Sequence, residues 1–174
     1  MAQFIAPTTR LHDSRLASRD EWGRGVHQDG GGLGANDDVD TREGFSAWIQ
    51  QLHQQSDPSI PIKEGRVHAT YWWIVERDTY LGAISLRHTL NDFLLHTGGH
   101  IGYGVRPTAR RRGLATWALG AVLPEARSLG LIRVLVTCDD NNVGSARPNE
   151  NNGGVLEDVR DTDLGHTRRY WMTL

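Results

Sequence analysis

HIGYGVRPTARRRGLAT, residues 100–116, is the most informative stretch of the chain. Its first part, His100–Val105, is apolar and predicts a strand that Pro107 ends. Its last part opens Ala115–Leu129, whose apolar side chains recur at helical spacing up to a stop at Gly130. Three arginines and a glycine lie between the two patterns. The stretch therefore predicts a strand, a basic glycine-containing loop and a helix in direct succession.

This arrangement suits a bound diphosphate. The first backbone N–H groups of a helix have no internal partner, and the helix dipole favours an anion there. Gly113 lets the backbone approach a ligand closely, and arginines add charge-assisted hydrogen bonds. The alternative is a solvated basic surface followed by an ordinary helix start. The loop lacks the Gly-Lys-Ser/Thr of a nucleotide P-loop, and the GxGxxG dinucleotide pattern is also missing because Gly102 and Gly104 lie within the strand.

The other segments alternate between strand and helix patterns. Asp29–Asp40 is glycine-rich and acidic and predicts a mobile loop. The resulting order, one strand, two helices, three strands, helix, strand, helix and two strands, predicts a mixed α/β layer architecture. Besides 100–105 and 115–129, the expected strands are Gln3–Pro7, Ala69–Glu76, Tyr80–Arg87, Leu131–Cys138, Val155–Arg160 and Arg168–Met172, and the expected helices are Arg10–Gly23, Thr41–Gln54 and Val143–Asn152.

Composition narrows the class of protein. The 174 residues fit one ordinary domain, and the net charge of -2 gives no global basic field for nucleic acid or an anionic membrane. Cys138 is the single cysteine, which excludes an internal disulfide and a cysteine-rich zinc site, so no metal is expected. No transmembrane or signal-peptide pattern is seen, and a cytoplasmic protein is predicted. A homodimer is compatible with these features.

The pattern R-x-x-G-x-A at Arg110, Gly113 and Ala115 resembles motif A of the GNAT acetyltransferases. The longer stretch 86–115 is similar to a bacterial GNAT subgroup of predicted acetyltransferases. The resemblance implies a single domain over 1–174 with a GNAT-type fold. This fold is a central, mostly antiparallel mixed sheet of about six to seven strands flanked by about four helices. It also implies acetyl-CoA as cosubstrate.

The same resemblance implies the coenzyme contacts. The diphosphate would lie on the loop and first helical turn, and the strand Tyr103–Val105 would pair with the pantetheine arm. Asn142 and Ser145 match family positions that face this arm, although Asn142 could equally be a turn or cap residue. Asn149 stands where many members carry a tyrosine acid. The implied coenzyme-binding residues are Tyr103, Gly104, Val105, Arg110, Arg111, Arg112, Gly113, Leu114, Ala115, Thr116, Asn142 and Ser145.

Acetyl transfer to a primary amine requires a base for the ammonium and tolerance of the departing thiolate. By direct attack in a ternary complex it needs no covalent enzyme intermediate. His100 occupies the family position of a carboxylate base, and His88 is a second candidate base; both could instead be structural. Tyr103 could supply a hydroxyl near the sulfur or simply pack in the strand. Cys138 is interpreted as a small core residue rather than a nucleophile.

Arg87 ends the second hairpin strand, and Asn91 and Asp92 follow it. The three are expected to line the acceptor pocket, and the alternative for each is a turn or solvent-facing residue. The acceptor itself, a small-molecule or peptide amine, is left open. The alternative function is a non-catalytic module that binds or senses acyl-CoA on the same fold. A nucleic-acid role for the arginine triplet is disfavoured because no wider basic patch accompanies it.

Overall fold

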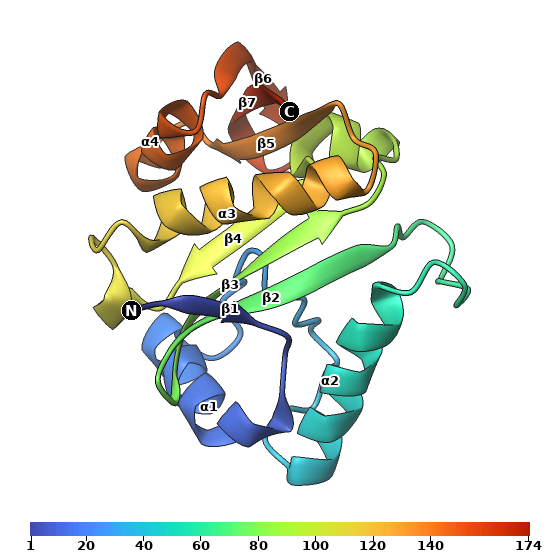
Figure 1. The fold of residues 1–174 in the computed structure, drawn as a ribbon, viewed down its shortest axis with the longest axis vertical. Coiled ribbons are helices and arrows are strands. Elements are labelled where there is room, and N and C mark those ends of the chain that lie inside the picture. The colour runs from blue at the N-terminus through green and yellow to red at the C-terminus, as the bar shows by residue number, and fades with distance from the viewer.

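Seven strands form one twisted sheet in the computed structural model, which describes residues 1–174 (Figure 1). The strand order is β1-β2-β3-β4-β5-β7-β6, and every neighbouring pair is antiparallel except β4 and β5. The strands are β1 (Gln3–Ile5), β2 (Ala69–Glu76), β3 (Thr79–Arg87), β4 (Ile101–Val105), β5 (Arg133–Asp139), β6 (Val155–Thr162) and β7 (Gly165–Thr173).

Helices cover both faces of this sheet (Figure 1). On one face α3 packs through Ala118, Leu119 and Val122, which are fully buried against β3, β4 and β5. On the other face α1 and α2 enclose a second core around Trp48 and Trp73. Each core forms because one apolar stripe of a helix meets one apolar face of the sheet. The helices are α1 (His12–Trp22), α2 (Arg42–Gln55), α3 (Leu114–Ser128) and α4 (Val143–Asn151).

The predicted fold class and the order of its main elements are confirmed, with boundaries that differ by a few residues. The largest difference is the last strand, which begins at Gly165 rather than Arg168 because a tight turn pairs Thr162 with Gly165. The sequence patterns missed three short helical turns: 3-10 turns at Thr9–Leu11 and Pro107–Ala109, and a π-helical turn, Leu94–Gly98, between β3 and β4. None is long enough to show a helical repeat of apolar residues.

Strands β4 and β5 separate soon after they meet. Their ladder contains a single residue pair, Ile101 with Val136, whereas β4 pairs with β3 from Ile101 to Val105. The β5-facing edge of β4 is therefore left without a strand partner from Gly102 onward. This opening is at the C-terminal part of β4, which leads directly into the arginine loop.

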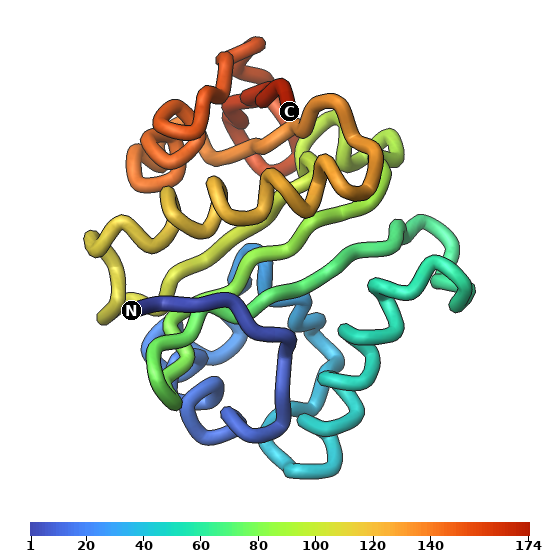
Figure 2. The backbone as a smooth tube through the Cα atoms, viewed as in Figure 1, coloured from blue at the N-terminus to red at the C-terminus, as the bar shows by residue number.

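The glycine-rich segment before α2 crosses the sheet on the face opposite α3, as the light-blue tube shows in Figure 2. It contains neither helix nor strand, as expected, but Gln28, Gly30 and Gly31 are buried. Gly30 and Gly104 allow the close approach: a Cβ atom at Gly30 would lie 2.4 Å from the Gly102 carbonyl oxygen, and one at Gly104 would lie 2.8 Å from the Asp29 carbonyl oxygen. The segment expected to be mobile is thus packed directly on β4.

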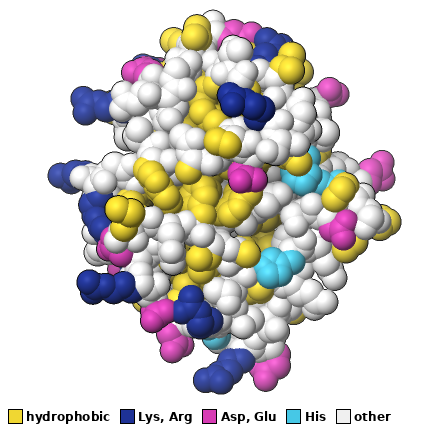
Figure 3. Space-filling view, in the orientation of Figure 1, with side chains coloured by type: hydrophobic (Ala, Val, Ile, Leu, Met, Phe, Trp, Pro, Cys, Tyr) yellow, Lys and Arg dark blue, Asp and Glu magenta, His cyan; other side chains and the backbone are white.

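On the face that carries α3, hydrophobic side chains gather in the middle and most charged side chains lie toward the margin (Figure 3). Trp117 of α3 is 38% exposed, and its ring packs at a tilt against the ring of Phe4 in β1, with the ring centres 4.9 Å apart. None of the helices has the length and apolar character needed to cross a lipid bilayer.

Candidate active site

The arginine loop presents a row of free backbone donors. The N–H groups of Arg111 to Thr116 have no hydrogen-bond acceptor in the protein, and no side chain caps α3. Arg111 and Gly113 both adopt left-handed backbone conformations, with φ of 61° and 75°. Such alternation turns successive N–H groups toward one side and creates an anion-binding concavity. The geometry and the helix dipole together make this loop suitable for a diphosphate.

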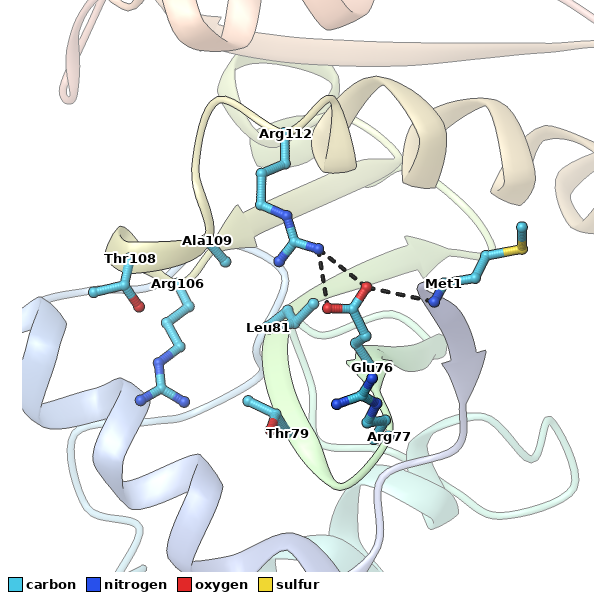
Figure 4. A pocket seen from close by; sticks show the side chains of 9 residues that line it. All are labelled: Met1, Glu76, Arg77, Thr79, Leu81, Arg106, Thr108, Ala109 and Arg112. Atoms are coloured by element: carbon cyan, nitrogen blue, oxygen red, sulfur yellow. Dashed lines mark hydrogen bonds and ion pairs between the residues drawn. The ribbon is translucent and has the colours of Figure 1, made fainter.

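Two of the three arginine side chains already have partners. Arg110 donates from Nε to the Val105 carbonyl oxygen at 3.1 Å, and its guanidinium lies 4.5 Å from the centre of the Trp22 ring. Arg112 donates to both carboxylate oxygens of Glu76 at 3.0 Å (Figure 4), and this contact holds the pKa of Glu76 below its usual value. Only Arg111 has no protein partner for its guanidinium. The sequence pointed to the arginine triplet as the source of charge for this anion site. In the structure, the free backbone amides contribute more to the site than the arginine side chains.

A cavity of about 530 Å³ lies beside the loop at the β2–β3 hairpin; we call it the hairpin cavity (Figure 4). Two of its three arginines are neutralised, because Arg112 pairs with Glu76 and Arg106 pairs with Glu21 at 2.7 Å. Its charges are thus largely compensated within the protein. The free amides of the loop are the stronger anion site.

Tyr103 extends from β4 to α4 near the opening between β4 and β5. Its hydroxyl lies 2.8 Å from Ser145 Oγ and is within reach of two acceptors, the Ser145 carbonyl oxygen at 2.9 Å and the Asn149 side-chain oxygen at 3.3 Å. Burial is the main reason that the pKa of Tyr103 is raised. Asn142 caps α4 by accepting the Ser145 N–H at 3.1 Å. The structure thus brings Tyr103, Asn142 and Ser145 together, the three residues that the family resemblance places near the pantetheine arm.

Asn149, which stands where many family members carry a tyrosine, is a core residue of this protein. It is fully buried, and its side-chain nitrogen lies 3.9 Å from the sulfur of Cys138, whose pKa burial raises to about 11. A thiol with this pKa is protonated at neutral pH, which fits the interpretation of Cys138 as a core residue.

His100 connects β4 to β5. Its ring Nδ1 accepts the Leu135 N–H at 2.9 Å, and its backbone N–H donates to the Leu135 carbonyl oxygen at 2.7 Å. Burial, with a smaller effect of Arg87, lowers its pKa to about 4. The neutral ring therefore has its only lone pair engaged by the backbone. This geometry favours the structural role over the catalytic one, and the role as base stays a prediction.

His88 follows β3, and its side chain reaches Thr70, which points to the opposite face of the sheet from Ala69, the strand partner of Arg87. Its Nε2 lies 2.8 Å from Thr70 Oγ1, and burial lowers its pKa. It does not line either of the two main cavities. His88 and His100, the two histidines that the sequence suggested as bases, therefore line neither of these cavities.

A second cavity, of about 500 Å³, lies between the glycine-rich segment and β2–β3; we call it the glycine-loop cavity. Of the three residues expected at the acceptor pocket, Arg87 and Asn91 line this cavity and Asp92 does not. The Asn91 side chain is structural, since it donates to the Gly65 carbonyl oxygen and accepts the Leu94 N–H. Arg87 donates from Nη1 to the carbonyl oxygens of Gly98 and Gly99, both at 3.0 Å.

Sequence reasoning missed several residues of this cavity. Ser85 and Tyr71 line it from the sheet, while His27 and Asp29 line it from the glycine-rich segment, where His27 Nε2 lies 3.0 Å from Asp29 Oδ1. Alternation along β3 could have indicated Ser85, which shares a face with Arg87. Nothing local in the sequence indicates that residues 27–30 fold back onto β4. No group of three or more His, Cys, Asp or Glu side chains forms a metal site.

Comparisons with known proteins agree with this geometry. A family model described as "Acetyltransferase (GNAT) domain" matches residues 33–155, and no curated protein sequence matches the chain. The ribosomal-protein-S5-alanine acetyltransferase from Vibrio fischeri is similar in structure, with a TM-score of 0.73 and 15% identity over 99% of this chain and 92% of that one. RimJ of Mycobacterium smegmatis, solved with a CoA-disulfide, has a TM-score of 0.72 and 15% identity over 99% of this chain and 81% of that one. The RimL ribosomal L7/L12 alpha-N-protein acetyltransferase, solved with coenzyme A, has a TM-score of 0.70 and 16% identity over 99% of this chain and 94% of that one.

Proposed function

Since the chain belongs to the GNAT acetyltransferase family, we propose that it moves the acetyl group of acetyl-CoA to a primary amine by direct attack in a ternary complex. The observation that carries this proposal is the row of free N–H groups from Arg111 to Thr116 at the start of the 15-residue helix α3. Structurally similar acetyltransferases have been solved with coenzyme A and with acetyl-CoA, which supports the same donor here. We also propose that residues 1–174 act as one domain, because all seven strands share one sheet.

In this proposal the loop amides hold the diphosphate. The unpaired edge of β4, from Tyr103 to Val105, gives the pantetheine arm a strand-like partner in the opening that β5 leaves. Asn142 and Ser145 border this opening from α4. The thioester would then lie near Tyr103, with the glycine-loop cavity on the other side of β4 as the acceptor site.

The reaction forms a bond between the amine nitrogen and the acetyl carbon and breaks the bond between that carbon and sulfur. The ammonium must first lose a proton, and the thiolate either leaves as an anion or takes a proton. Tyr103 is the hydroxyl we assign to the thiolate, since Asn149 has no acidic proton to give. A thiol pKa of about 8.5, by analogy with cysteine, makes the anion itself a tolerable leaving group.

The base is assigned within the glycine-loop cavity. His100 has its lone pair engaged, and His88 lies on the other face of the sheet. His27 lines the cavity and is oriented by Asp29, so its other ring nitrogen is free to accept a proton. His27 is therefore the candidate base we favour, while His100 and His88 serve as the alternatives in the tests below.

Thiol release from acetyl-CoA in the presence of a panel of small and peptide amines tests the proposed function. Acetyl-CoA binding with amine-dependent thiol release and an N-acetylated product by mass spectrometry would support it. Tight binding of acetyl-CoA without turnover of any amine would instead support a non-catalytic acyl-CoA-binding module.

A further inference from the structure

Arg87 is a cationic side chain of the glycine-loop cavity that has no ion-pair partner, although Tyr71 and Asp29 act on it electrostatically. It is mostly buried, forms no salt bridge, and burial lowers its pKa. A buried charge without a partner is costly, and natural proteins usually pair it. The cavity that Arg87 lines is therefore a place where an external anion would be favourable.

The orientation of the guanidinium is fixed. Its Nη1 donates to the carbonyl oxygens of Gly98 and Gly99, at the end of the π-helical turn. Its Nε and Nη2 have no acceptor in the protein, and neither atom is enclosed without access to solvent. These two nitrogens form one edge of the planar fork, and that edge matches the two oxygens of a carboxylate.

A second arginine adds positive charge to the same side of the glycine-loop cavity. Arg66 lines the same cavity and forms no salt bridge. Its charge lowers the pKa of Arg87, whereas Tyr71 and Asp29 raise it. Asp29 and Asp37 line the cavity from the glycine-rich segment, and neither pairs with an arginine. The cavity thus combines two unpaired cations from the β2–β3 side with two carboxylates from the loop side.

We propose that the acceptor is a small molecule that carries a carboxylate close to its amino group, as a free amino acid does. The free edge of Arg87, assisted by Arg66, would bind the carboxylate, and the acidic loop would receive the ammonium. The volume of about 500 Å³ suits a small ligand. This assignment rests on the proposed function, whose acceptor class it names.

The test compares each of several amino acids with its own amino amide by kcat/KM, in the wild type and in Arg87→Gln. Intrinsic differences in amine reactivity cancel when the carboxylate preference of the variant is divided by that of the wild type. We expect the wild type to prefer the carboxylate, and Arg87→Gln to reduce this preference by about 10- to 100-fold, the range for a charged hydrogen-bonded pair. Arg87→Lys should fall between them, because it keeps the charge but not the fork.

Two further variants serve as an independent test and as a control. Arg66→Gln breaks no side-chain hydrogen bond or salt bridge of the protein. It should reduce the carboxylate preference by less than Arg87→Gln does. It therefore still tests the assignment if the Arg87 variants do not fold. Arg127→Gln, at the exposed end of α3, should leave the preference unchanged. Acetyl-CoA affinity should be unaffected in all of them.

Equal turnover of amino acids and amino amides by the wild type, or a preference that survives in the Arg87 and Arg66 variants, would overturn the assignment while leaving the acetyltransferase activity established. A peptide with an acidic N-terminal residue that outperforms every free amino acid would also overturn it. Absence of thiol release with every amine would instead remove the proposed function itself.

Discussion

Gly30 and Gly102 are in backbone contact across the face of β4, where a Cβ atom on Gly30 would lie 2.4 Å from the Gly102 carbonyl oxygen. Gly30→Ala should therefore displace the glycine-rich segment and raise KM for the acceptor. Gly25→Ala is a matched control, because both residues have positive φ but a Cβ atom at Gly25 meets nothing within 4 Å. We expect the control to lose about 1 kcal/mol from backbone strain, and Gly30→Ala to lose about 1–3 kcal/mol more from overpacking. Equal stability and equal KM in the two variants would contradict the packed position of this segment.

His100→Asn separates the structural from the catalytic role of His100. An asparagine side-chain oxygen can accept the Leu135 N–H in place of Nδ1, so the variant should fold and retain kcat/KM within a few-fold. If His100 is the base, kcat/KM should instead fall by about 10²–10⁴-fold. Measurement at several pH values with an acceptor of low pKa prevents titration of the amine from imitating the result.

The same substitution changes the pH dependence of stability. The pKa of His100 is about 4 in the folded protein and near 6.5 in the unfolded chain, so between these values the unfolded state binds more protons. The free energy of unfolding should therefore fall as pH drops from about 6.5 to about 4. In His100→Asn this fall should be smaller. Chemical denaturation across this range measures the difference, and identical slopes would show that His100 is not buried in its neutral form.

His27→Gln tests the base assigned here. It removes the titratable ring from the glycine-loop cavity, and the only side-chain hydrogen bond of His27 that is lost is the one to Asp29. We expect kcat/KM to fall about tenfold or more, the lower range for loss of a general base, with no change in Tm. His88→Gln is the comparison variant and should retain activity. The reverse ranking of these two variants would move the base to His88.

Tyr103→Phe removes a buried hydroxyl that contacts Ser145 and Asn149. We expect stability to fall by about 1 kcal/mol, the usual value of such a hydrogen bond. If Tyr103 protonates the thiolate, turnover should also fall tenfold or more while acetyl-CoA affinity holds. Normal turnover in both Tyr103→Phe and Ser145→Ala would identify water as the proton donor. Asn149→Ala is expected to act mainly through stability, because Asn149 is fully buried.

Local patterns were enough for much of the molecule. The strand–RRRG–helix unit and the β2–β3 hairpin were predictable, because period and glycine placement are encoded within short segments. The contact between Tyr103 and Ser145 joins distant segments, and only the family resemblance suggested that both lie near the coenzyme. The partners of Arg110 and Arg112 were not predictable, since Trp22 and Glu76 are distant in the chain. For the same reason, the sequence could not show that His27 and Asp29 lie beside Arg87, or that Leu135 engages the lone pair of His100.

The central claim is that the free amides of Arg111 to Thr116 bind the diphosphate of acetyl-CoA. Calorimetric titration of acetyl-CoA into Gly113→Val and Gly130→Val tests it most directly, because these glycines lie at opposite ends of α3. Both have positive φ, 75° and 85°, and a Cβ atom at either meets nothing within 4 Å, so the backbone strain is matched. At Gly113 alone the added side chain would occupy the space that the ligand needs. We predict that Gly113→Val loses acetyl-CoA affinity by at least tenfold and that Gly130→Val keeps it; unchanged affinity in a folded Gly113→Val protein would contradict the account.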